Sequence, residues 1–144
     1  MFNDALKNVE NARNNYGVPD EFKFLNRIDG KDIANAPFTI IKCIQKVYQL
    51  YDKDAKKYRV NSEGEPILGF VTFVQIEDDT FIALKSTPLK EQLENITGEH
   101  YNTIGFFEVP VSGTKVKLGT TKVRYADKKE YDNWVLVDDN ESNN

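Results

Sequence analysis

One short helix with two clear boundaries separates two groups of extended segments in this chain of 144 residues. Thr87 and Pro88 offer an N-cap and a proline at the first helical position, and Gly98 offers a stop. The apolar side chains between them share one helical face, and they are Leu89, Leu93 and Ile96. The pattern predicts a helix over Pro88–Thr97 whose apolar face closes over one end of a β-structure.

The sequence before this helix favours three strands. Phe38–Tyr51 is rich in β-branched and aromatic residues, which predicts a long first strand. Its alternation of apolar and polar residues slips at Ile40–Ile41, which indicates a bulge that bends the strand. Gly69–Glu77 and Thr80–Ser86 predict two further strands, joined through Asp78-Asp79 in a tight hairpin.

Several short extended segments follow the helix. They are Thr103–Val111, Thr114–Leu118, Thr121–Tyr125 and Trp134–Val137, separated at Ser112-Gly113, at Gly119 and over residues 126–133. Three strands, one helix and then further strands is the element order of the OB-fold, a five-stranded Greek-key barrel with one helix between strands 3 and 4. The sequence therefore predicts a mainly β protein with the OB-fold. SH3-like barrels and other α+β folds stay open as alternatives.

The N-terminal residues predict a helical arm outside this barrel. Phe2, Leu6 and Val9 are spaced as one apolar edge of an amphipathic helix that ends near Asn15. A short helix with one apolar edge needs a surface to cover it, so these side chains either pack within the chain or join subunits. The predicted organisation is an N-terminal arm over residues 1–26, an OB-type barrel over residues 27–137 and a disordered acidic tail over residues 138–144.

The charge of the chain is unevenly distributed along its length. The net charge of -4 argues against a protein that coats duplex DNA by bulk positive charge. Yet Lys42–Arg59 holds six basic residues against two acidic ones, a local charge of +4, and Ser112–Trp134 holds six against three, a local charge of +3. This segregation leaves room for a groove that binds a polyanion.

The two basic segments are interleaved with aromatic residues, which is typical of single-stranded nucleic-acid binding. Cations follow the phosphates, and aromatic rings stack on bases at roughly 1 to 3 kcal/mol per base. From the first strand and the loop after it, the candidates are Lys42, Lys46, Tyr48, Lys56, Lys57, Tyr58 and Arg59. The second and third strands add Phe73, Gln75 and Lys85, and the C-terminal segment adds Lys115, Lys117, Lys122, Arg124 and Tyr125 on the border of the same groove.

Large aromatic residues also fill barrel interiors, so the phenylalanines have a second interpretation. We expect a mainly core role for six side chains, namely Phe70, Phe73, Phe81, Phe106, Phe107 and Trp134. Phe73 therefore stands in both groups. A module that binds another protein stays open as the alternative function.

Groups for catalysis or metal binding are scarce. Cys43 and His100 are the only thiol and imidazole, and Cys43 within an apolar strand is expected to be a core residue. His100 follows the helix stop, where we expect a capping role. Asp52-Lys53-Asp54 lacks the glycine and the terminal glutamate of an EF-hand loop. We therefore expect no enzymatic activity, no cofactor and no metal.

The stretch from Arg27 to Ile41, RIDGKDIANAPFTII, leads directly into the long first strand. It resembles the corresponding part of OB-type single-stranded-DNA-binding proteins of Gram-positive conjugative plasmids and phages. The resemblance extends over roughly residues 27–137 and implies sequence-independent binding of single-stranded DNA in conjugation or replication of a mobile element. RNA stays open as an alternative ligand. The polar end, Glu141–Asn144, lacks the apolar tip through which housekeeping relatives recruit repair enzymes.

The remaining expectations concern location. No apolar run approaches the roughly 20 residues of a membrane span, and the N-terminus lacks the pattern of a signal peptide. The single cysteine agrees with a reducing compartment. We expect a cytoplasmic protein without a membrane partner.

Overall fold

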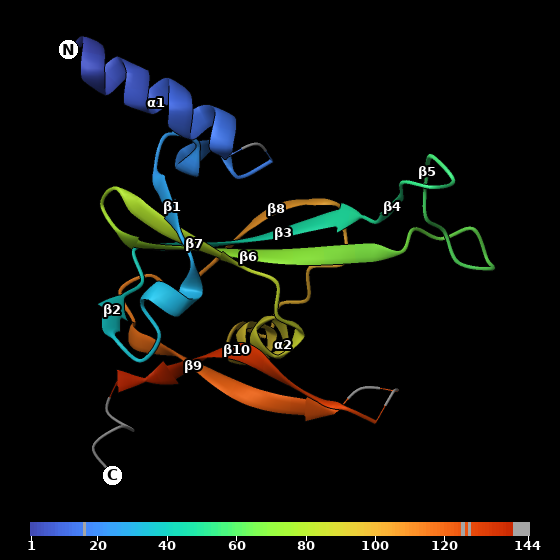
Figure 1. Cartoon of the computed structure of the whole chain (residues 1–144). Helices are drawn as coiled ribbons and strands as arrows, with labels where there is room; N and C mark the ends of the chain where they lie inside the picture. The colour runs from blue at the N-terminus through green and yellow to red at the C-terminus, as the bar shows by residue number, and fades with distance from the viewer. Residues whose placement is uncertain (16, 125, 127, 140–144) are drawn as a thin grey trace.

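A computed structural model describes residues 1–15, 17–124, 126 and 128–139, which form a mainly β structure with an N-terminal helix (Figure 1). A five-stranded sheet has the order β1–β7–β6–β3–β8, with β1 (Asn26–Ile28), β7 (Thr80–Leu84), β6 (Leu68–Glu77), β3 (Lys42–Gln49) and β8 (Gly105–Val109). A three-stranded sheet has the order β10–β9–β2, with β10 (Glu130–Asp138), β9 (Lys115–Arg124) and β2 (Pro37–Thr39). Strands β4 (Tyr51–Asp52) and β5 (Lys57–Tyr58) form a small ribbon. The helices are α1 (Phe2–Asn14) and α2 (Thr87–Thr97), with 3-10 turns η1 (Asp20–Phe22) and η2 (Gly30–Asp32).

The predicted long first strand bends where its alternation slips. Strand β2 pairs with β9 in the smaller sheet, and β3 pairs with β6 and β8 in the larger sheet. The chain passes from one sheet to the other at Ile40 and Ile41; Ile40 is buried and Ile41 is exposed. The predicted irregularity lies at these two residues, but the segment forms two strands in two sheets and not one long strand with a bulge.

The predicted hairpin of the second and third strands is also confirmed. Strands β6 and β7 are antiparallel and joined at Asp78-Asp79, with a register shift between Gln75 and Glu77. Two other details of the strand prediction are wrong. Gly119 does not separate two strands but lies inside β9, where it leaves room for the Val137 side chain of β10. Short β1, which pairs in parallel with β7, has no sequence signal that we detected.

The two sheets do not close into a barrel through strand pairing, and side chains explain why. The Ser86 hydroxyl donates a hydrogen bond to the Trp134 carbonyl oxygen at 2.6 Å. The Gln92 amide bonds both backbone groups of Leu136, donating to the carbonyl at 2.5 Å and accepting from the N–H at 3.0 Å. These bonds occupy the free edge of β10, so the edge needs no neighbouring strand. The closed five-stranded barrel of the sequence prediction is therefore not present in the described residues.

Helix α2 fills the space between the two sheets (Figure 1). Its N-cap is Ser86, not Thr87, and the Ser86 oxygen accepts a hydrogen bond from the Leu89 N–H at 3.2 Å. Gly98 ends the helix in the left-handed conformation, as expected. Leu89 and Leu93 are buried in the main core, which is the cluster of apolar side chains from both sheets and α2 that includes Val74 and Leu118. Ile96, by contrast, is 66% exposed. The expectation for Ile96 is wrong because the buried residues of α2 are Leu89, Leu93 and Glu94, and Ile96 lies outside this face.

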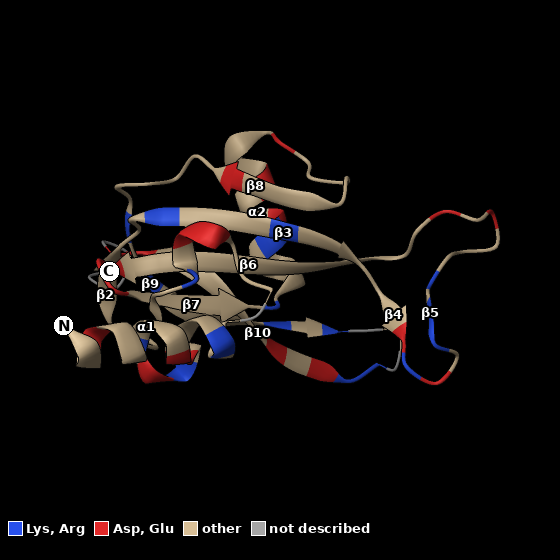
Figure 2. Ribbon diagram, turned by 90° about the horizontal axis from the view of Figure 1, so that it is seen from above, with Lys and Arg blue, Asp and Glu red and all other residues tan. Residues whose placement is uncertain are grey.

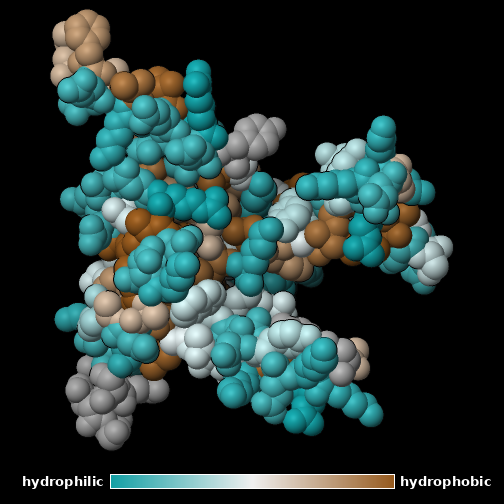
Figure 3. Space-filling model, in the orientation of Figure 1, coloured by the Kyte–Doolittle hydropathy of each residue, from teal (hydrophilic) through white to brown (hydrophobic). Residues whose placement is uncertain are grey.

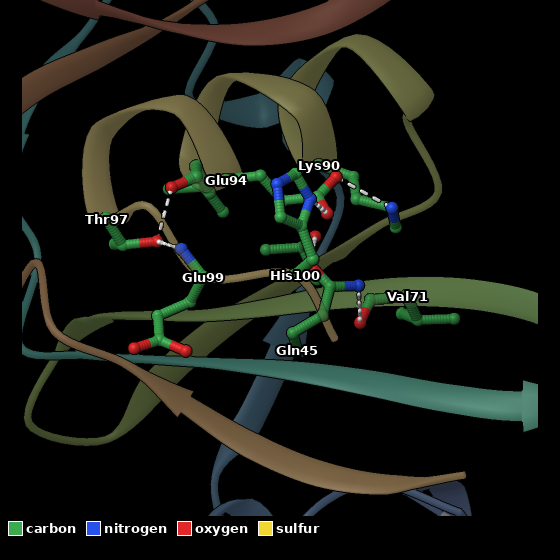
Figure 4. Close-up of polar contacts among 9 residues, drawn as sticks. Gln45, Val71, Lys90, Glu94, Thr97, Glu99 and His100 are labelled. Carbon is green, nitrogen blue, oxygen red and sulfur yellow. Dashed lines mark hydrogen bonds and ion pairs between the residues drawn. The ribbon is translucent and has the colours of Figure 1, made fainter. Parts of the chain in front are cut away.

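Glu94 contacts two side chains, Lys90 of α2 and His100, which follows the helix (Figure 4). It accepts a hydrogen bond from Lys90 Nζ at 2.7 Å and contacts His100 Nδ1 at 2.7 Å. Burial by itself raises the pKa of Glu94, but hydrogen bonds from Lys90 and His100 and their attraction outweigh it and leave the pKa below its ordinary value. The sequence predicts a capping role for His100, but in the structure its side chain contacts Glu94.

A second core lies on the opposite face of the five-stranded sheet, which we call the outer face. Phe22 of η1 is fully buried there against Phe73 and Phe81, with ring centroids 6.4 and 5.3 Å away. Ile44 and Val71 complete this cluster. The segment after α1, which the sequence assigned to the arm, is therefore packed onto the sheet.

We expect Phe22→Ala to lower the free energy of unfolding by about 3 to 5 kcal/mol, because it leaves a cavity between two buried rings. Val60→Ala, in the loop after β5, is the matched control, since Val60 is 52% exposed and its loss is expected to change stability by less than about 0.5 kcal/mol. Urea unfolding of both variants tests this. Equal effects of the two substitutions would contradict the packing of Phe22.

The Glu94 contacts predict an acid-sensitive contribution to stability. Because the folded pKa lies below the unfolded value, this contribution is complete above about pH 4.5 and is lost as the pH falls through the folded pKa. Glu94→Gln is therefore expected to be less stable than the wild type at pH 7, with a difference that shrinks toward pH 3. Urea unfolding across that range measures it, and exposed Glu91→Gln serves as the control. A difference that grows on acidification is the contrary result.

Candidate nucleic-acid interface

Three cationic side chains from three strands surround one hollow on the outer face. They are Arg27 of β1, Lys46 of β3 and Lys85, which directly follows β7. Arg27 is placed on this face because it pairs in parallel register with Phe81, and Lys85 because it alternates with Phe81 and Ala83. The hollow has a volume of about 410 Å³, and we call it the basic cleft.

The floor of the basic cleft is apolar and its lining contains no carboxylate. Val71, Phe73 and Ala83 form the floor, and Gly17 and Val18 form the rim toward α1. Among the described residues, none that lines the cleft is acidic. Positive charge is therefore concentrated beside a low-dielectric surface, which strengthens its attraction for an anion.

The surroundings of Lys46 in this cleft disfavour its charged form. Burial lowers the pKa of Lys46, and repulsion from Lys85 lowers it further. Its Nζ donates a hydrogen bond to the Gly17 carbonyl oxygen at 2.7 Å and lies 5.6 and 5.5 Å from the ring centroids of Tyr48 and Phe106. An anion bound between Lys46 and Lys85 would relieve their repulsion.

Other predicted residues of the sheet lie on the outer face in different roles. Lys42 forms an ion pair with Glu21 at 3.3 Å, and Gln75 Nε2 donates to the Asp78 carbonyl oxygen at 3.2 Å. The Tyr48 ring packs on Gly69, where an added Cβ would lie 2.6 Å from Tyr48 Cζ. Phe73 is only 3% exposed, so its assignment as a stacking platform is wrong and its core assignment is confirmed. The Phe22 ring, which packs against it, is the reason.

The predicted loop residues lie on a separate projection. Residues 50–67 extend away from both sheets as a projecting loop that contains β4 and β5 (Figure 1). Tyr58 is 61% exposed and packs edge to face on Tyr51 at 5.1 Å. Figure 2 shows blue basic segments along this projecting loop, whose basic residues are Lys53, Lys56, Lys57 and Arg59. They do not line the basic cleft.

The predicted second basic cluster does not border the same groove, because β9 lies in the other sheet. Acidic residues also neutralise much of it: Lys115 pairs with Asp139 at 3.9 Å, Arg124 with Glu130 at 3.0 Å, and Lys122 faces Asp132 in the strand register. Lys117 pairs in register with Val137 and Pro37. Tyr125 lies outside the described residues.

The apolar edge of α1 is uncovered in the single chain. Phe2, Leu6 and Val9 are 81%, 57% and 49% exposed, and α1 contains no buried residue. Figure 3 shows apolar atoms at the upper left, over α1. The C-terminal end of the helix is attached through Asn11 and Asn15, whose amides donate to Phe24 and Leu25 carbonyl oxygens at 3.1 and 2.8 Å.

The remaining aromatic predictions divide between core and surface. Phe81 is fully buried, and Phe70, Phe107 and Trp134 are half-buried. Phe106 is 51% exposed, so its core assignment is wrong: the side chain lies on the outer face of edge strand β8. Sequence analysis missed Arg27, because a three-residue strand shows no period from which its face can be inferred.

The thiol and the predicted acidic tail can also be placed. Cys43 is buried in the main core, as expected, and burial raises its pKa to about 12. Asp138, assigned to the tail, is the last residue of β10, and residues 140–144 lie outside the described part of the chain. Within that part, no three His, Cys, Asp or Glu side chains converge as a metal site would require, and no helix has the length and apolarity to cross a bilayer.

Comparison of the chain with protein-family models, curated proteins and solved structures finds no match.

Proposed function

We propose that this protein binds single-stranded nucleic acid, with DNA as the first candidate, at the basic cleft and without catalysis. The observation that supports this is the convergence of Arg27, Lys46 and Lys85 on a hollow with an apolar floor and, among the described residues, no carboxylate in its lining. A phosphodiester backbone supplies anions at regular spacing, and its bases supply apolar faces. Both parts of such a ligand match the chemistry of the cleft.

The element order supports the proposal that the fold is an open variant of the OB-fold. Strands β3, β6 and β7 form an antiparallel meander, α2 follows it, and β8 returns to pair with β3. The bent segment β2–β3 belongs to both sheets, as the first strand of such a barrel does. The basic cleft then lies on the face of the middle strands, where OB-folds bind oligonucleotides.

The sequence resemblance of Arg27–Ile41 to plasmid and phage single-stranded-DNA-binding proteins supports the same ligand. On this proposal the protein acts in the cytoplasm, in conjugation or replication of a mobile element. RNA is the alternative strand, because phosphates and bases are common to both nucleic acids.

Protein binding is the second candidate function, and one surface favours it. Ile104 and Phe106 are 54% and 51% exposed at the open edge of the five-stranded sheet. Beside Phe106, a hollow of about 260 Å³ is lined by Asp20, Glu21 and Glu108. A basic, extended segment of another protein matches this edge, and the acidic lining repels nucleic acid.

The double substitution Lys46→Ala/Lys85→Ala is expected to weaken binding of a labelled single-stranded oligonucleotide about tenfold or more at low salt. It also reduces the slope of log affinity against log salt by about 1.4, because two phosphate contacts are lost. Fluorescence polarisation at several salt concentrations measures both quantities.

Lys115→Ala/Lys122→Ala is the matched control, since it removes the same charge from the other sheet. It should leave the affinity within about twofold of the wild type. Equal losses in the two double variants would mean that net charge, not the basic cleft, determines binding. An absence of binding by the wild type at micromolar concentration would refute the proposed function.

The uncovered edge of α1 supports a proposal of self-association through Phe2, Leu6 and Val9. Removal of residues 1–14 is then expected to lower the number of subunits per particle, which is the mass in solution divided by the mass of one chain. Light scattering of the intact and shortened chains, with and without DNA, measures the mass. An unchanged number of subunits per particle under both conditions would rule out this role.

A further inference from the structure

A second hollow adjoins the basic cleft at the seam between β7 and β10. It has a volume of about 330 Å³ and is lined by residues 27–31, by the end of β7 and by Trp134. Three residues line both hollows, namely Arg27, Ala83 and Lys85. We call the second one the seam hollow. A ligand that contacts Arg27 and Lys85 therefore reaches both spaces.

Trp134 is positioned by a contact of its backbone and by a contact of its ring. The Ser86 hydroxyl donates to the Trp134 carbonyl oxygen at 2.6 Å, which fixes β10 beside the end of β7. Gly30 lies over the ring, and a Cβ there would come within 3.3 Å of Trp134 Cε2 and 2.9 Å of a Leu118 methyl carbon. The ring is half-buried against the main core and lines the hollow with its accessible part. An aromatic surface is thus in place beside the hollow in the absence of a ligand.

The charge around this surface favours an anionic ligand. Arg27, Lys31 and Lys85 contribute three cations to the lining, against one carboxylate, Asp29. Ile28, Ala83 and Leu84 provide apolar contacts beside the indole. Cations at the rim and an aromatic ring inside are the two features that a nucleotide needs, because its phosphate stays hydrated while its base stacks.

We propose that the seam hollow receives one base of the bound strand, which packs against Trp134 while its phosphates contact Arg27 and Lys85. This inference rests on the proposed nucleic-acid binding and adds a site at which a base is held. The cations shared by the two hollows place the backbone at their boundary, from which a base turns into the seam. The ligand class is a nucleobase within a single strand, since pairing in a duplex would keep the base in its stack.

The intact protein reports on this site directly, because Trp134 is its only tryptophan. Oligothymidylate is expected to quench the Trp134 fluorescence with the same midpoint that polarisation gives for binding. An oligonucleotide of equal length made only of abasic sites keeps the phosphates and lacks the bases. It is expected to bind more weakly, at low salt, and to leave the tryptophan emission unchanged.

The Trp134→Leu variant adds an affinity measurement by polarisation. It keeps an apolar side chain against the core and removes the aromatic surface. It is expected to weaken oligothymidylate binding roughly five- to tenfold, within the range of one lost stacking contact, and to leave abasic binding within about twofold. If the variant does not fold in a thermal melt, the fluorescence of the wild type decides the question alone.

The outcomes separate the two proposals. Binding of oligothymidylate with unchanged Trp134 emission overturns the base site and leaves the proposed function standing. Equal quenching by the abasic strand also overturns it, since the indole then responds to phosphate alone. No binding in polarisation overturns the proposed function, and the base site falls with it.

Discussion

Three side-chain hydrogen bonds to the edge of β10 determine the architecture around which the other features are arranged. Ser86 and Gln92 satisfy the backbone of Trp134 and Leu136, at the places where a closed barrel would pair another strand. The sheets are consequently joined by α2 and by the bent segment at Ile40–Ile41. The seam left between β7 and β10 is filled only in part, by Trp134. An unclosed sheet thus creates the hollow beside the basic cleft.

The outer face of the five-stranded sheet carries two hollows of opposite charge, and Phe22 packs on the same face. Its ring covers the centre, between Phe73 and Phe81. The cations of the basic cleft come from β1, β3 and the end of β7, whereas Asp20 and Glu21 of η1 and Glu108 of β8 line the acidic hollow. On the proposed function, a strand bound at these cations would be repelled by the acidic hollow and would run toward β7 and β1. That direction leads to the seam hollow.

Sequence reasoning was most successful where a pattern repeats locally. The helix between Pro88 and Gly98, the hairpin at Asp78-Asp79 and the irregularity at Ile40–Ile41 all follow from caps, turn residues and a two-residue period. It failed where tertiary packing decides. Nothing near Phe73 in the sequence shows that Phe22, 51 residues earlier, covers it. Likewise, Arg27 belongs to a strand of three residues, and only its pairing with β7 brings it to Lys85.

The acidic balance of the chain is compatible with a basic site because, among the described residues, no carboxylate lines the basic cleft and several acids elsewhere pair with other cations. Glu21 pairs with Lys42, Asp139 with Lys115, Glu130 with Arg124, and Glu94 with Lys90. The cations of the cleft have no such partner among its lining residues. Three phosphate contacts give a salt slope of only about -2 for a single strand. Ionic contacts alone are therefore a modest source of affinity at physiological salt, and stacking of bases has to supply much of the rest. On this proposal, Trp134 beside the shared cations is the ring that supplies the stacking.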